Sequence, residues 1–220
     1  MGTYEADSLN DTLFPSVYTV LSAVYSRTGD SVKISLSGEE TLVLPAEGYA
    51  LSQLREGSEL SRDELLKFKR VEAAFLARKK AVRLLDQRAY TAAQLKRKLA
   101  EAMYPAAVIK EVIDDLAARG FLDDRKYAEG WIASQIRRKP QGRRLLYMGL
   151  VRKGVARREA EQLIAAGYPA AQEEEQCRIC MKKFAARRGW EAESLLPAVA
   201  RRGFEMSLIK KVYRELQARR

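Results

Sequence analysis

The fold is decided by one stretch of the chain, Arg143-Arg-Leu-Leu-Tyr-Met-Gly-Leu-Val-Arg-Lys-Gly154. Leu146 and Leu150 are four residues apart, a spacing that places both on one face of a helix, and Gly154 is a typical residue for ending it. The same arrangement recurs 51 residues earlier and 49 residues later. The aligned residues are Leu95, Leu99 and Met103 in the first copy, and Leu195, Val199 and Gly203 in the third. We therefore predict a helical repeat of about fifty residues.

Further positions keep the same offsets and also fall at helical spacing. They are Ala77, Ala128 and Cys177; Ala81, Ile132 and Met181; Ile109, Ala160 and Ile209; Val112, Leu163 and Val212; and Ile113, Ile164 and Tyr213. Each copy then has three amphipathic helices, each too short to be stable alone. They must bury their apolar faces on each other and on the neighbouring copies.

The residues before the repeats predict β-strands. Three runs, Val17–Tyr25, Ser31–Leu36 and Thr41–Leu44, are rich in β-branched and aromatic residues and are separated by turn residues. Ser61, with Glu64 three residues later, fits the start of a helix. The expected domains are residues 1–60, a β module whose first ~15 residues we expect to be disordered; residues 61–122, a linking helix with the first repeat; residues 123–168, the second repeat; and residues 169–220, the third repeat.

The composition describes a folded protein. Of the 220 residues, 47% are apolar and 31% are charged, which is neither a disordered nor a membrane composition. No apolar run approaches the roughly 18 residues needed to cross a bilayer. The acidic start of the chain lacks the basic and apolar regions of a signal peptide. We expect a cytoplasmic protein.

The positive charge is concentrated in the C-terminal half. Residues 1–70 carry 7 Lys and Arg against 11 Asp and Glu, whereas residues 125–220 carry 23 against 10, a net charge of +13. An imbalance of this size indicates a polyanionic partner, nucleic acid or an acidic protein surface. The alternatives are a basic surface that only keeps the protein soluble, and binding to anionic lipid.

Basic residues recur at equivalent places in the copies and form the candidate binding surface, which we call the basic stripe. Some precede helix ends, where cations are favoured electrostatically. Others, such as Arg157 and Arg158, fall in first turns, where the helix dipole disfavours them. The stripe comprises Arg88, Arg137, Arg138, Lys139, Arg143, Arg144, Arg152, Lys153, Arg157, Arg158, Arg187, Arg188, Arg201 and Arg202.

Catalytic and metal sites are hard to place. The chain has no histidine, and it lacks both a P-loop and a dinucleotide-binding glycine motif. The pair Cys177 and Cys180 has the spacing of half a zinc site, but Cys177 lies on a core register and no second pair exists. Asp123 and Asp124 fit the start of a helix better than an acid/base pair. We predict no enzyme activity, no metal and no cofactor.

Three segments resemble motifs of the RecX family of regulators of the RecA recombinase. They are Gly120-Phe-Leu-Asp-Asp-Arg-Lys-Tyr-Ala128, the run from Gly142 to Val155, and Arg88-Ala-Tyr-Thr-Ala-Ala-Gln-Leu-Lys-Arg-Lys-Leu99. Ala93 departs from the family pattern, which has an acidic residue there. The N-terminal strands are similar to the β-containing extension of longer members, so the resemblance covers residues 17–220.

The resemblance implies a mainly α fold: three tandem three-helix repeats in an elongated curved array, with a small N-terminal β-strand module. It also implies a monomeric, non-catalytic protein of DNA repair, recombination and the SOS response. Such a protein binds RecA filaments on DNA and suppresses their ATPase, strand exchange and growth. Single- or double-stranded DNA is a further partner. The alternative from another class is a stand-alone basic module that binds nucleic acid directly, and an enzyme using an acid such as Asp124 is a third.

Overall fold

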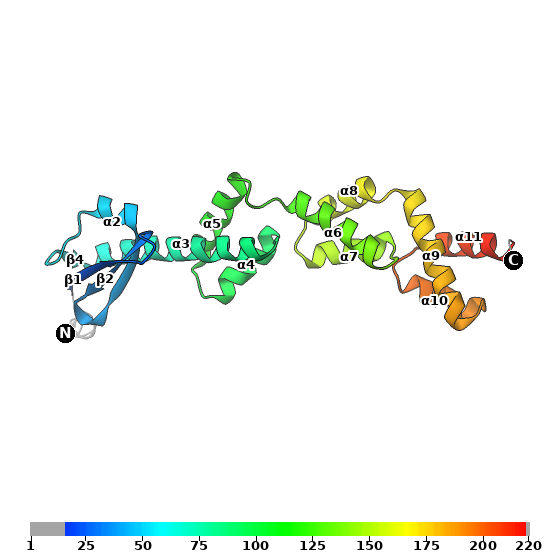
Figure 1. The fold of residues 1–220 in the computed structure, drawn as a ribbon, viewed down its shortest axis with the longest axis horizontal. Helices are drawn as coiled ribbons and strands as arrows, with labels where there is room; N and C mark the ends of the chain where they lie inside the picture. The colour runs from blue at the N-terminus through cyan, green and yellow to red at the C-terminus, as the bar shows by residue number, and fades with distance from the viewer. Residues whose placement is uncertain (1–15, 219–220) are drawn as a thin grey trace, which may run out of the picture. The chain divides into compact units, whose positions relative to one another are not determined.

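The computed structural model describes residues 16–218, which form a small antiparallel sheet followed by a series of helices (Figure 1). The expected disorder of the first ~15 residues lies outside the described residues. The chain divides into two compact units. One comprises the residues up to Leu84 together with Leu99–Asp114, and the other comprises Leu85–Lys98 together with Asp115–Arg220.

The sheet has four strands in the order β3-β2-β1-β4: β1 Val17–Tyr25, β2 Ser31–Leu36, β3 Thr41–Pro45 and β4 Glu59–Ser61. All neighbouring pairs are antiparallel. Val32, Ile34 and Leu36 alternate with polar residues along β2 and are fully buried, as a strand with one covered face requires. Leu65 belongs to the same hydrophobic core.

Two elements of this module were not predicted. The helix α2 (Ala46–Ser52) follows β3, and β4 pairs with the start of β1 through Leu60 and Tyr18. The prediction of three strands was therefore incomplete, because a strand of three residues is too short to show a period. A 3-10 turn, η1 (Ser37–Glu39), connects β2 to β3.

The outer edge of β3 is covered by the first helix of the main series, α3 (Arg62–Gln87). The Glu72 carboxylate accepts a hydrogen bond of 2.7 Å from the Val43 amide, and the Lys69 ammonium donates one of 2.6 Å to the Thr41 carbonyl. Both backbone groups are thereby satisfied, which hinders the pairing of this edge with another strand. Ser61 and Glu64 form the predicted capping box at the start of α3.

Nine helices follow the sheet within the described residues, as the repeat pattern predicted. The first repeat has α3, α4 (Ala92–Glu101) and α5 (Ala106–Ala118). The second has α6 (Asp124–Arg138), α7 (Arg143–Arg152) and α8 (Arg157–Gly167), and the third has α9 (Ala170–Arg188), α10 (Ala192–Ala200) and α11 (Met206–Gln217). Within the second unit, α7 and α8 pack with α6, and α10 and α11 pack with α9. The domain boundaries expected from the sequence remain a proposal.

The aligned apolar positions are buried in all three copies. Leu95, Leu146 and Leu195 are each 0% exposed. The same equivalence holds for Ala77, Ala128 and Cys177, for Ala81, Ile132 and Met181, for Leu99, Leu150 and Val199, for Ile109, Ala160 and Ile209, and for Val112, Leu163 and Val212. The remaining row is looser, because Ile113 and Tyr213 are half-buried while Ile164 is buried. Residues related by the offsets of 51 and 49 therefore occupy equivalent positions in the hydrophobic core.

The chain leaves the second helix of every repeat through a residue with positive φ. Gly154 has φ +90° and Gly203 has φ +84°, a region that side chains disfavour and glycine adopts freely. Met103 occupies this position in the first repeat with φ +63°. Because its side chain is 89% exposed, burial does little to offset the backbone strain.

Replacing Met103 with glycine should stabilise the protein. The substitution removes a Cβ atom from a left-handed conformation, which is worth about 1 kcal/mol, and removes almost no buried surface. Denaturant titration of Met103→Gly should show a higher free energy of unfolding than wild type. Met103→Ala is the control, because it shortens the side chain but keeps the Cβ atom. An equal gain in both variants would show that φ is not the cause.

The first and second repeats are joined by two hydrogen bonds that are donated from the start of α4, the second helix of the first repeat. The Thr91 hydroxyl, at the start of α4, donates to the Lys153 carbonyl at the end of α7, with an O–O distance of 2.6 Å. The Ala92 amide donates to the Asp124 carboxylate at 2.8 Å. A Cβ atom on Gly154 would overlap that of Ala93, so the two backbones approach closely here.

The second and third repeats are joined in the same way, by residues that align with those of the first joint. The Gly142 amide donates to the Arg202 carbonyl at 2.8 Å, and the Arg143 amide donates to the Glu173 carboxylate at 2.8 Å. A Cβ atom on Gly142 would overlap the carbonyl oxygen of Gly203. We call each set of two hydrogen bonds a repeat clamp, and both clamps lie within the second unit.

The clamp can be tested at Gly142, whose φ of −84° any residue can adopt. Gly142→Ala should therefore cost about 1–3 kcal/mol only because its Cβ atom overlaps Gly203. Gly130→Ala is the matched control: it lies in α6, nothing lies within 4 Å of its added Cβ atom, and it should gain about 0.5–1 kcal/mol. Thermal and denaturant unfolding give both values. Equal effects would mean that the close approach at Gly142 is unimportant.

Candidate polyanion-binding site

Basic side chains from separate parts of the second and third repeats meet around two adjoining cavities of about 310 and 320 Å³. Lys139 and Arg202 line both cavities. Lys183 and Arg187 of α9 line the first, and Arg138 of α6 lines the second. Among residues 16–218, no carboxylate lines either one. We call this double cavity the basic cleft.

Helix ends account for the positions of Arg138, Lys139 and Arg187, but not for the convergence of all five cations. Arg138 and Lys139 lie at the end of α6, and Arg187 lies in the last turn of α9. Cations are favoured at the negative ends of helix dipoles. Five cations around one double cavity also repel each other, and the described residues of its lining include no negative charge. An anionic ligand would relieve this repulsion.

Arg202 is fixed by the second clamp. Its carbonyl accepts from the Gly142 amide, and its Nε donates to the Pro140 carbonyl at 3.2 Å. The guanidinium is therefore positioned before any ligand arrives, and the ordering cost of binding falls on the remaining side chains. Gln135 and Gln141 add neutral polar groups to the lining of the cleft.

The structure brings part of the predicted basic stripe together. Arg138, Lys139, Arg187 and Arg202 line the basic cleft, and Arg143 and Arg144 line a different hollow. The other members line neither: Arg88, Arg137, Arg152, Lys153, Arg157, Arg158, Arg188 and Arg201. Lys183 was not among the predicted residues. Its place in the doublet Lys182-Lys183 was visible, but which side of α9 faces the cleft was not.

Arg143 has a structural role that explains its place in a first helical turn. Its guanidinium donates twice to the Tyr168 carbonyl, at 3.1 and 2.7 Å, and lies 3.3 Å from the Glu173 carboxylate. Glu173 is itself buried. The Arg143 guanidinium is therefore paired within the protein, and its role in partner binding remains a proposal.

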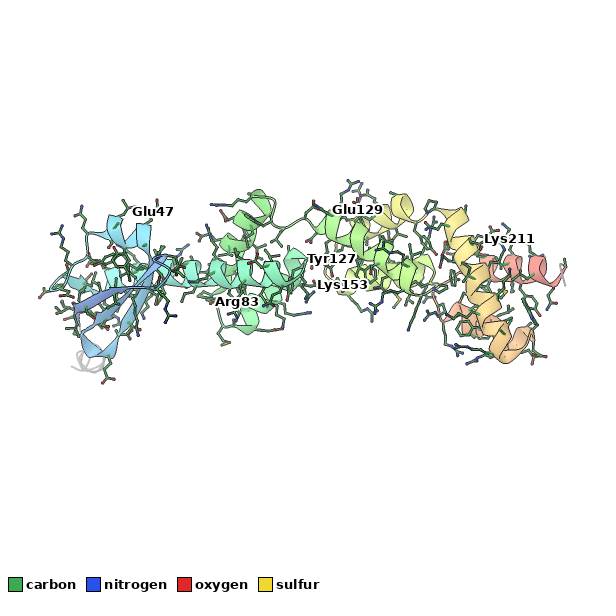
Figure 2. The ribbon with its side chains drawn as sticks, in the orientation of Figure 1. Glu47, Arg83, Tyr127, Glu129, Lys153 and Lys211 are labelled. Carbon is green, nitrogen blue, oxygen red and sulfur yellow. The ribbon has the colours of Figure 1, made fainter. Side chains whose placement is uncertain are left out.

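Two more stripe residues lie against aromatic rings. The Lys153 ammonium is 5.9 Å from the centre of the Tyr127 ring and 5.5 Å from that of Trp131, and Tyr127 and Lys153 are labelled in Figure 2. The Arg88 guanidinium stacks 3.8 Å above the Tyr90 ring. Such cation–π contacts contribute about 0.5–1 kcal/mol each at exposed sites. These two cations have partners within their own repeats.

The two adjacent aspartates act on different helices. Asp123 caps α6 by accepting from the Lys126 amide at 2.8 Å, as predicted. Asp124 instead accepts from the Ala92 amide and so belongs to the first clamp. The structure thus gives both carboxylates a role in helix ends. Within residues 16–218, no group of three or more Cys, His, Asp or Glu is placed to hold a metal ion.

Both cysteines are buried in the core of the third repeat, Cys177 on the predicted register and Cys180 one turn later. Burial raises the pKa of the Cys177 thiol to about 12 and that of the Cys180 thiol to about 11. The thiolate is the reactive form. Both thiols are therefore protonated at neutral pH and form part of the hydrophobic core.

Comparison with known proteins identifies the family. Residues 77–116 match the first three-helix domain of RecX, and residues 123–164 match the second. The regulatory protein RecX of Treponema pallidum (strain Nichols) is 31% identical over 131 residues, which are 60% of this chain and 79% of the relative. That of Chlorobium limicola is 32% identical over 141 residues, which cover 62% and 86%.

The chain belongs to the RecX family. Solved RecX structures share its fold. The crystal structure of a regulatory protein RecX gives a TM-score of 0.72 at 16% identity, over 89% of this chain and 98% of the other. RecX from Lactobacillus salivarius gives 0.62 at 19% identity, over 66% and 97%. The relatives are named as regulatory proteins.

No helix between residues 16 and 218 is long and apolar enough to span a bilayer.

The buried thiols predict slow alkylation and a loss of stability at alkaline pH. Iodoacetamide at pH 8 should label both cysteines at least about tenfold more slowly in the folded protein than in urea. Burial of the protonated thiols raises their pKa values in the folded state and so contributes to the free energy of unfolding. This contribution is fully present below pH 9, the ordinary thiol pKa, and is lost as the pH rises towards 11–12. Fast labelling of the folded protein, measured by mass spectrometry, would contradict the buried core position.

Proposed function

We propose that this RecX-family protein regulates the RecA recombinase by binding RecA filaments on DNA, and that its basic cleft contacts the anionic partner. The expected effect is suppression of RecA's ATP hydrolysis, strand exchange and filament growth. The protein does this without catalysis of its own. A partner that acts on DNA would place the protein in the cytoplasm.

The basic cleft is the observation that carries the proposal. Arg138, Lys139, Lys183 and Arg187 converge there with Arg202, and the described part of the chain places no carboxylate in the lining. Phosphates and clustered carboxylates are the anions that such a group of cations binds. A RecA filament on DNA offers both kinds of group. The family membership supports RecA as the partner, and the charge supports the surface.

The proposal is tested by removing four charges from the cleft while leaving Arg202, which the clamp needs. The variant carries Arg138→Gln, Lys139→Gln, Lys183→Gln and Arg187→Gln. Because all four side chains are exposed, the fold should persist. Affinity for RecA on single-stranded DNA, formed with a non-hydrolysable ATP analogue, should fall at least about tenfold. The dependence of affinity on salt should also become weaker.

The matched control removes the same charge elsewhere, with Lys80→Gln, Arg83→Gln, Lys96→Gln and Lys126→Gln. All four are exposed and line no part of the cleft; Arg83 is labelled in Figure 2. Equal losses in both variants would make net charge the cause and the cleft irrelevant. If the wild type neither binds RecA filaments nor lowers their ATPase, the proposed function is wrong.

The same measurements separate the second candidate function, a stand-alone module that binds nucleic acid. The carboxylate-free lining favours this candidate as well, because it suits a phosphate backbone. Affinity for bare single-stranded DNA is measured beside affinity for the filament. If the cleft variant loses both in parallel and RecA adds nothing to wild-type binding, the protein is such a module.

A further inference from the structure

A second hollow in the same unit differs from the basic cleft in shape and chemistry. It is a groove of about 760 Å³ that shares no lining residue with the cleft. Its lining comes from α7, α8 and the start of α11, with single residues of α9 and α10. The volume lies within the roughly 300–1,000 Å³ range of pockets that hold ligands. We call it the junction groove.

The middle of the junction groove is apolar. Ile164 and Phe204 are buried beneath it, 4% exposed each, and Tyr147 is half-buried. Ala165 is exposed, and the Met206 side chain is 44% exposed to solvent. An apolar side chain that entered this groove would cover Ala165 and Met206. Its binding would be favoured by about 25 cal/mol for each Å² of apolar surface removed from water.

The charged residues of the groove argue against a nucleic acid as its occupant. Arg143 is already neutralised by Glu173. The exposed charges that remain are Arg144, Glu161 and Glu205, a net charge of −1 in the most basic part of the chain. A phosphate backbone would meet two carboxylates and one guanidinium here, so it would be repelled. A polypeptide can present both an apolar and a basic side chain.

We propose that the junction groove binds a polypeptide segment of the protein partner, which inserts an apolar side chain between Tyr147, Ala165 and Met206. A lysine or arginine beside that side chain then lies near Glu161 and Glu205. This inference rests on the proposed function, in which the partner is RecA. The two hollows contact different parts of the filament. The basic cleft binds its anionic groups, and the junction groove binds a segment of the RecA protein.

The first test fills the groove without changing any charge. Ala165→Trp places a large side chain at an exposed helical position that lines the groove, so the fold should survive. Ala166→Trp is the matched control: it is the next residue of α8, is also exposed, and does not line the groove. Affinity for the RecA filament should fall at least about tenfold in the first variant and stay within about twofold in the second.

The second test identifies what enters the groove. The native thiols are buried, so a cysteine introduced as Ala165→Cys can be labelled with a benzophenone maleimide at neutral pH. Illumination of the labelled protein on RecA filaments should cross-link it to a RecA peptide that contains apolar and basic residues. Mass spectrometry locates the peptide. The Ala166→Cys conjugate sets the background.

The outcomes separate the two proposals. Normal filament binding by Ala165→Trp, cross-links mainly to DNA, or cross-links no stronger than those of the Ala166→Cys conjugate would overturn the groove as a docking site and leave the proposed function standing. Failure of the wild-type protein to bind RecA overturns both. Loss of filament binding in Ala165→Trp with unchanged affinity for bare DNA supports the groove as the protein contact.

Discussion

The close approach of backbone at the ends of the second helices is the constraint on which the series of repeats depends. At the second clamp, the Gly142 amide reaches the Arg202 carbonyl because neither Gly142 nor Gly203 carries a side chain. The buried polar groups at the joint then have partners, as an interface between short helices requires. Arg202 owes its position in the basic cleft to the same hydrogen bond. Changes at the joint would therefore also disturb the binding surface.

The clamp also explains why some carboxylates and cations were difficult to interpret from the sequence. Asp124 and Glu173 are 49 residues apart and accept from the first helical amides of two aligned helices. Each carboxylate lies far along the chain from the helix that it caps. Local patterns describe capping within one helix, whereas these caps act between repeats. The role of Arg143 was hidden for the same reason. The sequence placed it in the basic stripe, whereas its partners Tyr168 and Glu173 follow it by 25 and 30 residues.

The core was predictable because helical periodicity repeats at two fixed offsets. Leu95, Leu146 and Leu195 had to be equivalent once the offset was recognised, and all three are fully buried. The candidate site was only partly predictable. Composition located the positive charge in the C-terminal half, but the direction of each side chain depends on how helices from two repeats pack. For that reason Lys183 was missed, while Arg157 and Arg158 lie outside the cleft.

The repeated clamp has a consequence for how such proteins change in length. The donors at Thr91 and Gly142 and the acceptors at Lys153 and Arg202 occupy aligned positions, so either end of the second repeat fits a neighbour of the same kind. An in-frame duplication of this repeat would create one more joint with a complete set of donors and acceptors. The aligned position in the third repeat is Glu191, which has neither the hydroxyl with which Thr91 donates nor the bare Cα that lets the Gly142 amide approach a carbonyl. The gene can thus gain whole units by internal duplication more readily than by extension beyond α11.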